Sequence, residues 1–428
     1  MRARWAVIPV AIGVATCNPA SAMADPGGEC CADLEQRVAE LEATAVRKGT
    51  RKVKLEVSGW VNQAMFLWDD GVESNIYIGT NSLEQDRFQF TGEAKISDDW
   101  SAGYRLQIGL NGAASNQFSQ DAPDGVTPNT FTTRHAHWFL KSKTYGKFSV
   151  GLIGTATYDL LDDGNAVNTR AYSDADAPAV ALGQFKTRVG GAFVNNLQWR
   201  DILQGVNNDT PGDNGRRNVI RYDSPALHGF VLTATWGEDD MGGVALTYKN
   251  EFGDFKVLAR AGYEHNSDSN ISACNTTVDD LDCEWWGAAG TIMHKPTGLY
   301  VYGGFGEQHD DSEEDFDPTA DSTDTVWFIQ PGIEQKWCSL GKITVFGEFR
   351  HDNPGSNLGK NTGGPGAPFI QEGDLDFWAA GVVQNIENAA MDLYLIYRHS
   401  EGDFTDHAGK TFDLDAFDMV ISGTRIQF

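Results

Sequence analysis

From residue 53 to its end, the chain alternates apolar and polar side chains with a period of two. Residues 53–67, 87–96 and 101–110 each place apolar side chains at every second position, with charged, amide or small side chains between them. Successive side chains of a strand point to opposite faces, so each segment makes one apolar and one polar face. Several segments run about ten to fifteen residues, which exceeds the usual soluble strand and matches a tilted strand that crosses a bilayer.

The connections between these segments alternate between short turns and longer polar loops. The short turns lie at 97–100, 142–146, 224–229, 250–254, 295–298, 338–341 and 387–390. The loops lie at 69–82, 111–132, 155–216, 238–241, 266–283, 308–324, 351–373 and 400–412. An additional apolar segment at 193–199 would make a seventeenth strand and put the chain ends on opposite sides, so we place it inside the loop 155–216.

Seven turns and eight loops connect sixteen strands. The predicted fold class is all-β: a sixteen-stranded antiparallel transmembrane β-barrel over residues 53–428, with short periplasmic turns and long external loops. Such a barrel is wide enough to leave a water channel.

The composition excludes two other classes of protein. The mean hydropathy is −0.37, and past residue 24 no apolar run reaches the roughly 18 residues of a transmembrane helix, so a helical membrane protein is excluded. The 33 Lys and Arg against 60 Asp and Glu give a formal net charge of −27. No nucleic-acid partner is expected, because phosphate binding needs clustered Lys and Arg.

Residues 1–24 have the organisation of a secretory signal peptide. Two arginines precede a short apolar stretch, and Ala22-Met23-Ala24 forms a small-x-small cleavage site, so we expect cleavage after Ala24 and export. Residues 25–52 then form a periplasmic N-terminal arm. Its apolar positions follow a short heptad spacing, at Leu34, Val38, Leu41 and Ala45. This coiled-coil-like helix either joins subunits or lies on the rest of the protein.

Export also bears on the cysteines. Cys274 and Cys283 lie in one polar segment, close enough for a loop disulfide in an oxidising compartment. The alternative is two unpaired thiols. The pairing of Cys30, Cys31 and Cys338 is left open.

The end of the chain and several internal segments resemble a known family. The last strand, DMVISGTRIQF (418–428), ends on Phe428, and a terminal aromatic after an alternating strand resembles the assembly signal of outer-membrane barrels. Three segments resemble strand and turn signatures of Gram-negative trimeric porins: YGKFSVGLIG (145–154), NVIRYDSPALHGF (218–230) and VVQNIENAAMDLYLIYRH (382–399). CCADLEQRVAELEA (30–43) followed by VSGWVNQAMF (57–66) is similar to the start of porins from the alphaproteobacterial branch.

This resemblance implies a function and a set of partners. Porins of this family are outer-membrane homotrimers without cofactors that contact outer-membrane lipid and lipopolysaccharide and let small hydrophilic solutes and ions diffuse passively. Their third loop, here 155–216, folds inward and narrows the lumen. One alternative is a channel selective for sugars or oligosaccharides, with Trp60 and Trp68 as stacking side chains. A second alternative is a secreted soluble β protein such as a lectin or a hydrolase.

Charged side chains on the third loop and on the facing strands define a candidate pore constriction. Its acidic side comprises Asp159, Asp162, Asp163, Asp174 and Asp176, and its basic side comprises Arg87, Arg105 and Arg134. Opposed charges in a narrow aqueous passage create a transverse field that orders water and penalises apolar solutes. Arg134 shares its alternation phase with Ala136 and Trp138, which should face lipid. The alternative is that these charges simply tolerate water, as any lumen-facing residue must.

Residues 310–324 carry eight carboxylates. Surface divalent cations are one expectation for this loop, and a solvated acidic loop that attracts cations without binding them is the other. Either predicts a weak cation preference.

His135 and His137 lie on one strand face without an identifiable third ligand, and neither a nucleophile elbow nor a Walker loop occurs. We therefore predict neither a metal site at these histidines nor an enzymatic activity.

Overall fold

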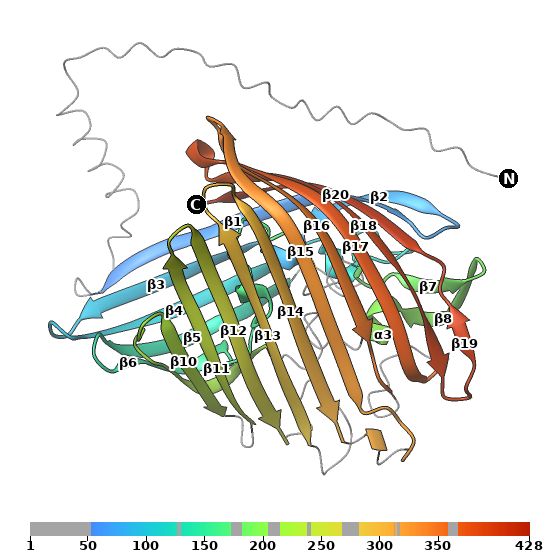
Figure 1. Cartoon of the computed structure of the whole chain (residues 1–428), viewed down its shortest axis with the longest axis horizontal. Coiled ribbons are helices and arrows are strands. Elements are labelled where there is room, and N and C mark those ends of the chain that lie inside the picture. The colour runs from blue at the N-terminus through green and yellow to red at the C-terminus, as the bar shows by residue number, and fades with distance from the viewer. Residues whose placement is uncertain are drawn as a thin grey trace.

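The protein is a closed antiparallel β-barrel of sixteen strands (Figure 1). The structure, a computed structural model, describes residues 53–125, 130–172, 182–203, 215–237, 241–267, 282–311, 313–314, 317–357 and 367–428. The predicted signal peptide (1–24) and N-terminal arm (25–52) lie outside these residues. Over the part that the structure describes, the predicted fold class and strand number are confirmed.

The barrel sheet contains eighteen strand segments that occupy sixteen positions. They are β1 (Lys54–Asp69), β2 (Ser74–Thr80), β3 (Arg87–Lys95), β4 (Trp100–Asn111), β5 (Thr130–Ser142), β6 (Gly146–Gly154), β9 (Arg216–Asp223), β10 (Phe230–Gly237), β11 (Met241–Phe252), β12 (Phe255–Asn266), β13 (Cys283–His294), β14 (Leu299–Asp310), β15 (Thr323–Cys338), β16 (Gly341–Asn353), β17 (Ile370–Ile386), β18 (Met391–Asp406), β19 (Thr411–Asp413) and β20 (Phe417–Gln427). β2 and β3 share one position because both pair with β1. β19 and β20 share another, because both pair with β18.

Helices among the described residues are short: η1 (Ser82–Glu84), η2 (Ser115–Gln117), η3 (Asp162–Gly164), α3 (Trp199–Leu203) and η5 (Glu387–Ala389). None of the helices in this described part is long and apolar enough to cross a membrane.

The first and last strands close the barrel. β1 pairs with β20 from Trp60 opposite Gln427 to Asp69 opposite Asp418. Beyond this ladder, Gly59 and Phe428 exchange two backbone hydrogen bonds of 3.0 Å. A closed ladder leaves no unpaired strand edge along the barrel wall, and hydrocarbon surroundings demand this.

Two of the loop boundaries predicted from the sequence are wrong. The segment 69–82 contains β2, and the segment 400–412 contains the end of β18 and part of β19. In β2 apolar side chains occupy both faces, because Ile76 and Ile78 are exposed while Tyr77 is buried, and at the end of β18 outward-facing side chains such as Glu401 are polar. Neither stretch therefore shows the alternation of apolar and polar side chains by which the other strands are recognised. Their backbones nevertheless continue the antiparallel pairing.

The outer face of the barrel is apolar and bears aromatic side chains near both ends. Exposed aromatic residues near the long loops are Trp236, Tyr263, Trp286, Trp327, Trp378 and Tyr397. Those near the short turns are Trp100, Tyr145, Tyr222, Phe230, Phe252, Phe255 and Trp337. Aromatic girdles at both interfaces are typical of transmembrane barrels, so the band between them is the membrane-facing zone.

The third loop crosses the barrel interior and binds the opposite wall. Leu160 and Leu161 are buried in one apolar cluster with inward-facing side chains such as Tyr302 and Phe328. Hydrogen bonds join the loop to β13–β15 and β18: Ala166 N to Thr291 Oγ1 (3.0 Å), Thr291 Oγ1 to the Gly164 carbonyl (2.7 Å), Tyr302 OH to the Leu161 carbonyl (2.8 Å), Asn168 N to Glu334 Oε2 (2.9 Å) and Tyr172 OH to Asp392 Oδ2 (2.6 Å). The inward fold expected for this loop is therefore present.

The later part of the loop forms the hairpin of β7 (Lys186–Val189) and β8 (Ala192–Gln198), which pair only with each other. The segment 193–199 thus lies in the third loop, as predicted, and not in the barrel wall. Arg188 of this hairpin contacts Asp70 (2.7 Å) and Glu73 of the first external loop. Asp415 accepts hydrogen bonds from the backbone of Gly190 and Gly191. These contacts tie three external loops together.

Gly59 offers a test of the barrel closure. A Cβ at this position overlaps the carbonyl oxygen of Arg87 and lies 2.9 Å from the Phe428 ring. We expect Gly59→Ala to destabilise the barrel by about 1–3 kcal/mol, as overpacking does. The measurement is the temperature of the folded-to-unfolded mobility shift on SDS gels. Gly347→Ala is the matched control, because its Cβ meets nothing closer than 4.0 Å. Equal transition temperatures for the two variants would contradict the packing described here.

Candidate pore constriction

The open passage lies between the third loop and the wall formed by β3–β6 and β9. Because the loop packs against the far wall, space remains on this side as a cavity of about 1010 Å³. Its basic lining residues are Lys54, Arg87, Arg105, Arg134, Lys147, Arg170, Arg216 and Arg221, and its acidic ones are Glu56, Glu84, Glu93, Asp159, Asp162, Asp163 and Asp223. Among the described residues, the charges of the lining are thus almost balanced.

The loop side of the cavity carries three of the predicted carboxylates. Asp159, Asp162 and Asp163 each have an oxygen within 4.8 Å of the others. Burial raises the pKa of the Asp159 carboxyl, against the opposing effect of Arg170. Asp174 and Asp176, the other predicted members, lie outside the described residues.

Arg170 is a central member of the site that the sequence analysis missed. One of its terminal nitrogens lies 3.4 Å from Asp159, 2.7 Å from Asp162 and 2.8 Å from Asp163. Arg260 of β12 contacts Asp163 as well, at 2.7 Å. The acidic side is therefore partly neutralised from within its own loop. Arg170 is the only Lys or Arg between residues 155 and 185, and that isolation among carboxylates was the available signal.

Glu84 is a second missed group, and it comes from the break between β2 and β3. The break is held to β1, because Asn62 donates from its backbone to Asp86 (2.5 Å) and from its side chain to the Glu84 carbonyl (3.1 Å). The Glu84 carboxylate contacts Arg87 at 2.8 Å and Arg170 at 2.9 Å. It thereby joins the barrel wall to the third loop. The only sign in the sequence is the loss of alternation over residues 81–86.

The predicted basic residues Arg87 and Arg105 line the passage from β3 and β4. Arg87 lies over the Trp60 ring, 4.5 Å from its centroid. Arg105 donates from Nε to Gln89 Oε1 at 3.0 Å. Their placement on the lumenal face agrees with their alternation phase.

Arg134 also lines the passage, although its alternation phase points to lipid. The register of β4 with β5 shifts here: Gln107 faces His135 while Ile108 faces Thr133. Arg134 is the extra residue of this β-bulge, which lets it and His135 both reach the lumen. Its guanidinium donates to Gln85 Oε1 at 2.8 Å. Outward alternation resumes afterwards, and Trp138 is exposed on the outer face.

Three further basic side chains extend this wall. Arg216 donates to the Tyr158 hydroxyl, and Arg221 contacts Asp223 at 2.9 Å. Lys147 pairs across the sheet with Asp223. The alternation of β6 and β9 could have identified Lys147 and Arg221, because their neighbours Phe148 and Ile220 are exposed on the outer face.

The remaining predicted residues occupy other places. Phe428 ends the closing strand and is exposed. Cys283, at the start of β13, is disulfide-bonded, but Cys274 lies outside the described residues, so their pairing stays a prediction. His135 and His137 are buried in the lumenal wall of β5, with ring centroids 5.8 Å apart. Within the acidic segment 310–324, three of the described carboxylates are buried rather than solvated: Asp310, Glu313 and Asp324.

The closed barrel, the loop folded into it and the charged passage beside that loop define a membrane channel. The family model for Gram-negative porins matches residues 10–416. The chain therefore belongs to the Gram-negative porins, and it is an outer-membrane protein. Its assignment to the alphaproteobacterial branch stays a prediction.

Solved structures support the same fold. The anion-selective porin from Comamonas acidovorans is 13% identical with a TM-score of 0.56, covering 88% of this chain and 100% of that chain. The trimer form of the outer-membrane protein OmpT of Vibrio cholerae is 13% identical with a TM-score of 0.51, covering 88% and 99%. The outer-membrane channel DcaP of Acinetobacter baumannii is 12% identical with a TM-score of 0.50, covering 90% and 100%. Curated protein sequences contain no match.

The attachment of the loop can be tested at Tyr172. Burial raises the pKa of its hydroxyl, which stays protonated and donates to the buried Asp392. A hydrogen bond to a charged group contributes about 1.5–3 kcal/mol. Tyr172→Phe should therefore loosen the loop and increase open-channel current noise in single-channel records. Tyr397→Phe is the matched control, because its hydroxyl donates at 2.7 Å to Asp418 on the outer face. Equal noise in both variants would contradict this role.

Proposed function

We propose that the chain forms a water-filled channel through which small hydrophilic solutes and ions diffuse passively, with the constriction as its filter. The observation that carries this proposal is the placement of charge. The loop side presents Asp159, Asp162 and Asp163, and the wall side presents a row of arginines. Opposed charges on the two sides give a transverse field, which orders water and penalises apolar solutes. The described residues of the lining together carry little net charge, because basic and acidic side chains are nearly equal in number.

The surroundings of Trp60 and Trp68 favour general diffusion over a sugar-selective channel. Arg87 and Arg425 lie over the Trp60 ring, at 4.5 Å and 5.7 Å from its centroid. Trp68 is buried, and it packs against Phe185 and Phe417. Trp68 is therefore not available for stacking a sugar, and the Trp60 ring already has two guanidinium groups beside it. These surroundings support a general diffusion channel over the hypothesis of a sugar-selective channel with these two tryptophans as stacking side chains.

Liposome swelling tests this choice. General diffusion predicts swelling rates that fall smoothly with sugar size and do not depend on stereochemistry. A rate that saturates, or that favours one sugar over its epimer, would support the selective alternative. Failure of every small sugar to enter would contradict both.

We place the predicted weak cation preference in the external loops rather than in the constriction. Asp311 and Asp321 of the acidic segment are exposed, whereas the described residues that line the passage include one more basic than acidic side chain. A preference that arises from exposed charges must be screened by salt.

Ionic strength therefore gives a direct prediction. The screening length falls from about 10 Å at about 0.1 M salt to about 3 Å at about 1 M. Reversal potentials in salt gradients should show a cation preference at low ionic strength that fades at high ionic strength, and Asp311→Asn with Asp321→Asn should reduce it. A preference that persists at high salt would place its origin in the constriction. An anion preference, as named for the Comamonas acidovorans porin, would contradict the proposal.

A charge-conserving double variant separates the transverse field from the net charge. Asp162→Asn combined with Arg105→Gln removes one charge from each side of the passage. Ion selectivity should stay within about twofold of wild type, because the net charge of the passage is unchanged. The permeation of less polar solutes relative to polar ones should rise severalfold, because the weaker field orders a smaller amount of water that such a solute has to displace. Antibiotic uptake into proteoliposomes measures this ratio. An unchanged ratio would show that the opposed charges do not act as a filter.

We further propose that the channel is a homotrimer. The V. cholerae neighbour is described in a trimer form, and the apolar outer face can be buried between subunits as well as in lipid. Conductance that closes in three equal steps after a single insertion event supports the trimer. Conductance that always changes in independent single steps, at all protein concentrations, contradicts it.

A further inference from the structure

The outer rim of the barrel, just beyond the external aromatic girdle, carries histidines next to carboxylates. Four strands that run toward the long loops, β12, β14, β16 and β18, each carry one outward-facing histidine: His265, His309, His351 and His399. Each histidine lies within 4.0 Å of at least one carboxylate. The channel function uses none of these residues, because all four side chains point away from the lumen.

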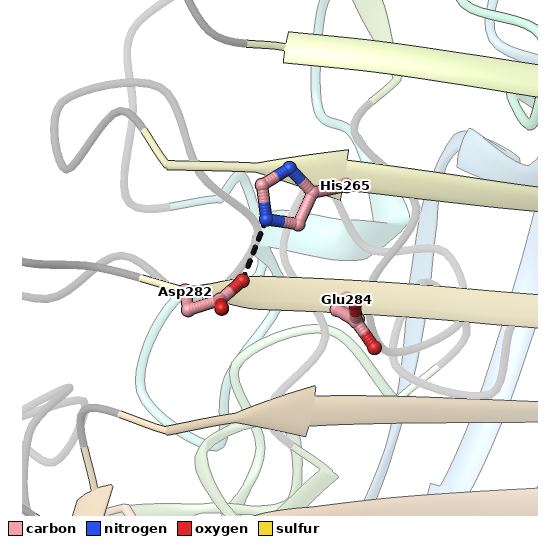
Figure 2. Close-up of side chains that lie close together, drawn as sticks. All are labelled: His265, Asp282 and Glu284. Carbon is pink, nitrogen blue, oxygen red and sulfur yellow. Dashed lines mark hydrogen bonds and ion pairs between the residues drawn. The ribbon is translucent and has the colours of Figure 1, made fainter.

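One such group is His265, Asp282 and Glu284. His265 Nε2 lies 2.6 Å from Asp282 Oδ1, and Glu284 is the cross-strand partner of His265. Each of the three offers one ligand atom within 4.8 Å of the others. Figure 2 shows the imidazole on one strand and both carboxylates on the next. His265 is 38% exposed and Asp282 is 55% exposed, so an ion can reach the group from outside.

The same arrangement recurs four strands further along the sheet. His351 of β16 faces Asp376 of β17, with Asp374 two residues before it, just as His265 faces Glu284 with Asp282 two residues before it. His351 Nδ1 lies 2.8 Å from Asp376 Oδ1 and 3.8 Å from Asp374 Oδ1. The register of the three side chains is thus the same in two separate hairpins, but the contacts differ: His265 contacts only the carboxylate two residues before its cross-strand partner, whereas His351 contacts both carboxylates.

The position of the group favours a cation as its ligand. Tyr263 and Trp286, a cross-strand pair of the aromatic girdle, lie two residues from His265 and Glu284 along β12 and β13, on the side of the short turns. The group therefore lies at the level of the lipid headgroups. Carboxylates outnumber histidines in both groups, so a phosphate would be repelled unless a cation lies between.

We propose that His265, Asp282 and Glu284 bind a divalent transition metal ion, with Zn²⁺ as the representative, on the outer rim of the barrel. One imidazole nitrogen and two carboxylate oxygens form a three-ligand set that Zn²⁺ accepts, with its fourth position open to water or to a headgroup oxygen. Ca²⁺ and Mg²⁺ prefer oxygen ligands alone and gain nothing from the imidazole. Tyr263 acts as a positioning residue, because its hydroxyl donates to Glu284 Oε1 at 2.6 Å.

The experiment measures zinc binding to the full, untagged protein in detergent, with free thiols blocked by iodoacetamide. Isothermal titration with ZnCl₂ is compared among wild type, His265→Ala, Asp282→Asn and His351→Ala. His294→Gln is the matched control, because His294 lies at the opposite end of β13, beside a short turn. The mobility shift on SDS gels verifies that each variant is folded.

We expect His265→Ala and Asp282→Asn each to weaken zinc binding at this site at least about tenfold, the lower range seen when even outer-shell groups of a metal site are changed. His294→Gln should bind as wild type does, and His351→Ala should leave the His265 site intact. A hundredfold excess of Ca²⁺ should not displace the zinc. Two results would overturn the proposal: a folded His265→Ala variant that binds zinc as tightly as wild type, or displacement of the zinc by an equal concentration of Ca²⁺. Either result would mean that His265 and its carboxylates form an ion pair only.

Discussion

A strand that crosses a membrane must find partners within the protein for all of its backbone polar groups, and the rest of this structure depends on that constraint. Pairing of β1 with β20 meets it by closing the sheet. Closure makes the alternation of side chains functional, because one face of every strand then meets lipid and the other meets the interior. The same residues that give the chain its modest mean hydropathy therefore build an apolar exterior around a polar lumen.

The third loop divides that lumen unequally. Its apolar side chains pack on one wall, and its buried hydrogen bonds, such as Tyr172 to Asp392, fix it there. The loop therefore presents its carboxylates toward the opposite wall, where the arginines lie. Arg170 and Glu84 connect the two sides at one edge of the passage, so the filter is a network of ion pairs rather than two separate rows of charge.

The sequence predicted what depends on local periodicity. Strand number, turns and the lumenal faces of Arg87 and Arg105 all follow from a period of two. Arg134 could not be placed, because one extra residue in β5 changes its face without changing the pattern around it. Glu84 and Arg170 were missed because their roles come from contacts between distant segments, and no spacing along the chain records those. The segments 69–82 and 400–412 looked like loops because neither alternates apolar with polar side chains: β2 has apolar side chains on both faces, and the end of β18 has polar side chains facing outward.

The central claim is that an open, aqueous and charge-lined passage runs beside the inward-folded loop. Single-channel recording of the purified protein in a planar lipid bilayer tests it most directly. The structure predicts long-lived, stepwise conductance that is ohmic and grows in proportion to salt concentration at high ionic strength. Insertion without conductance, or conductance that saturates as at a binding site, would contradict the account.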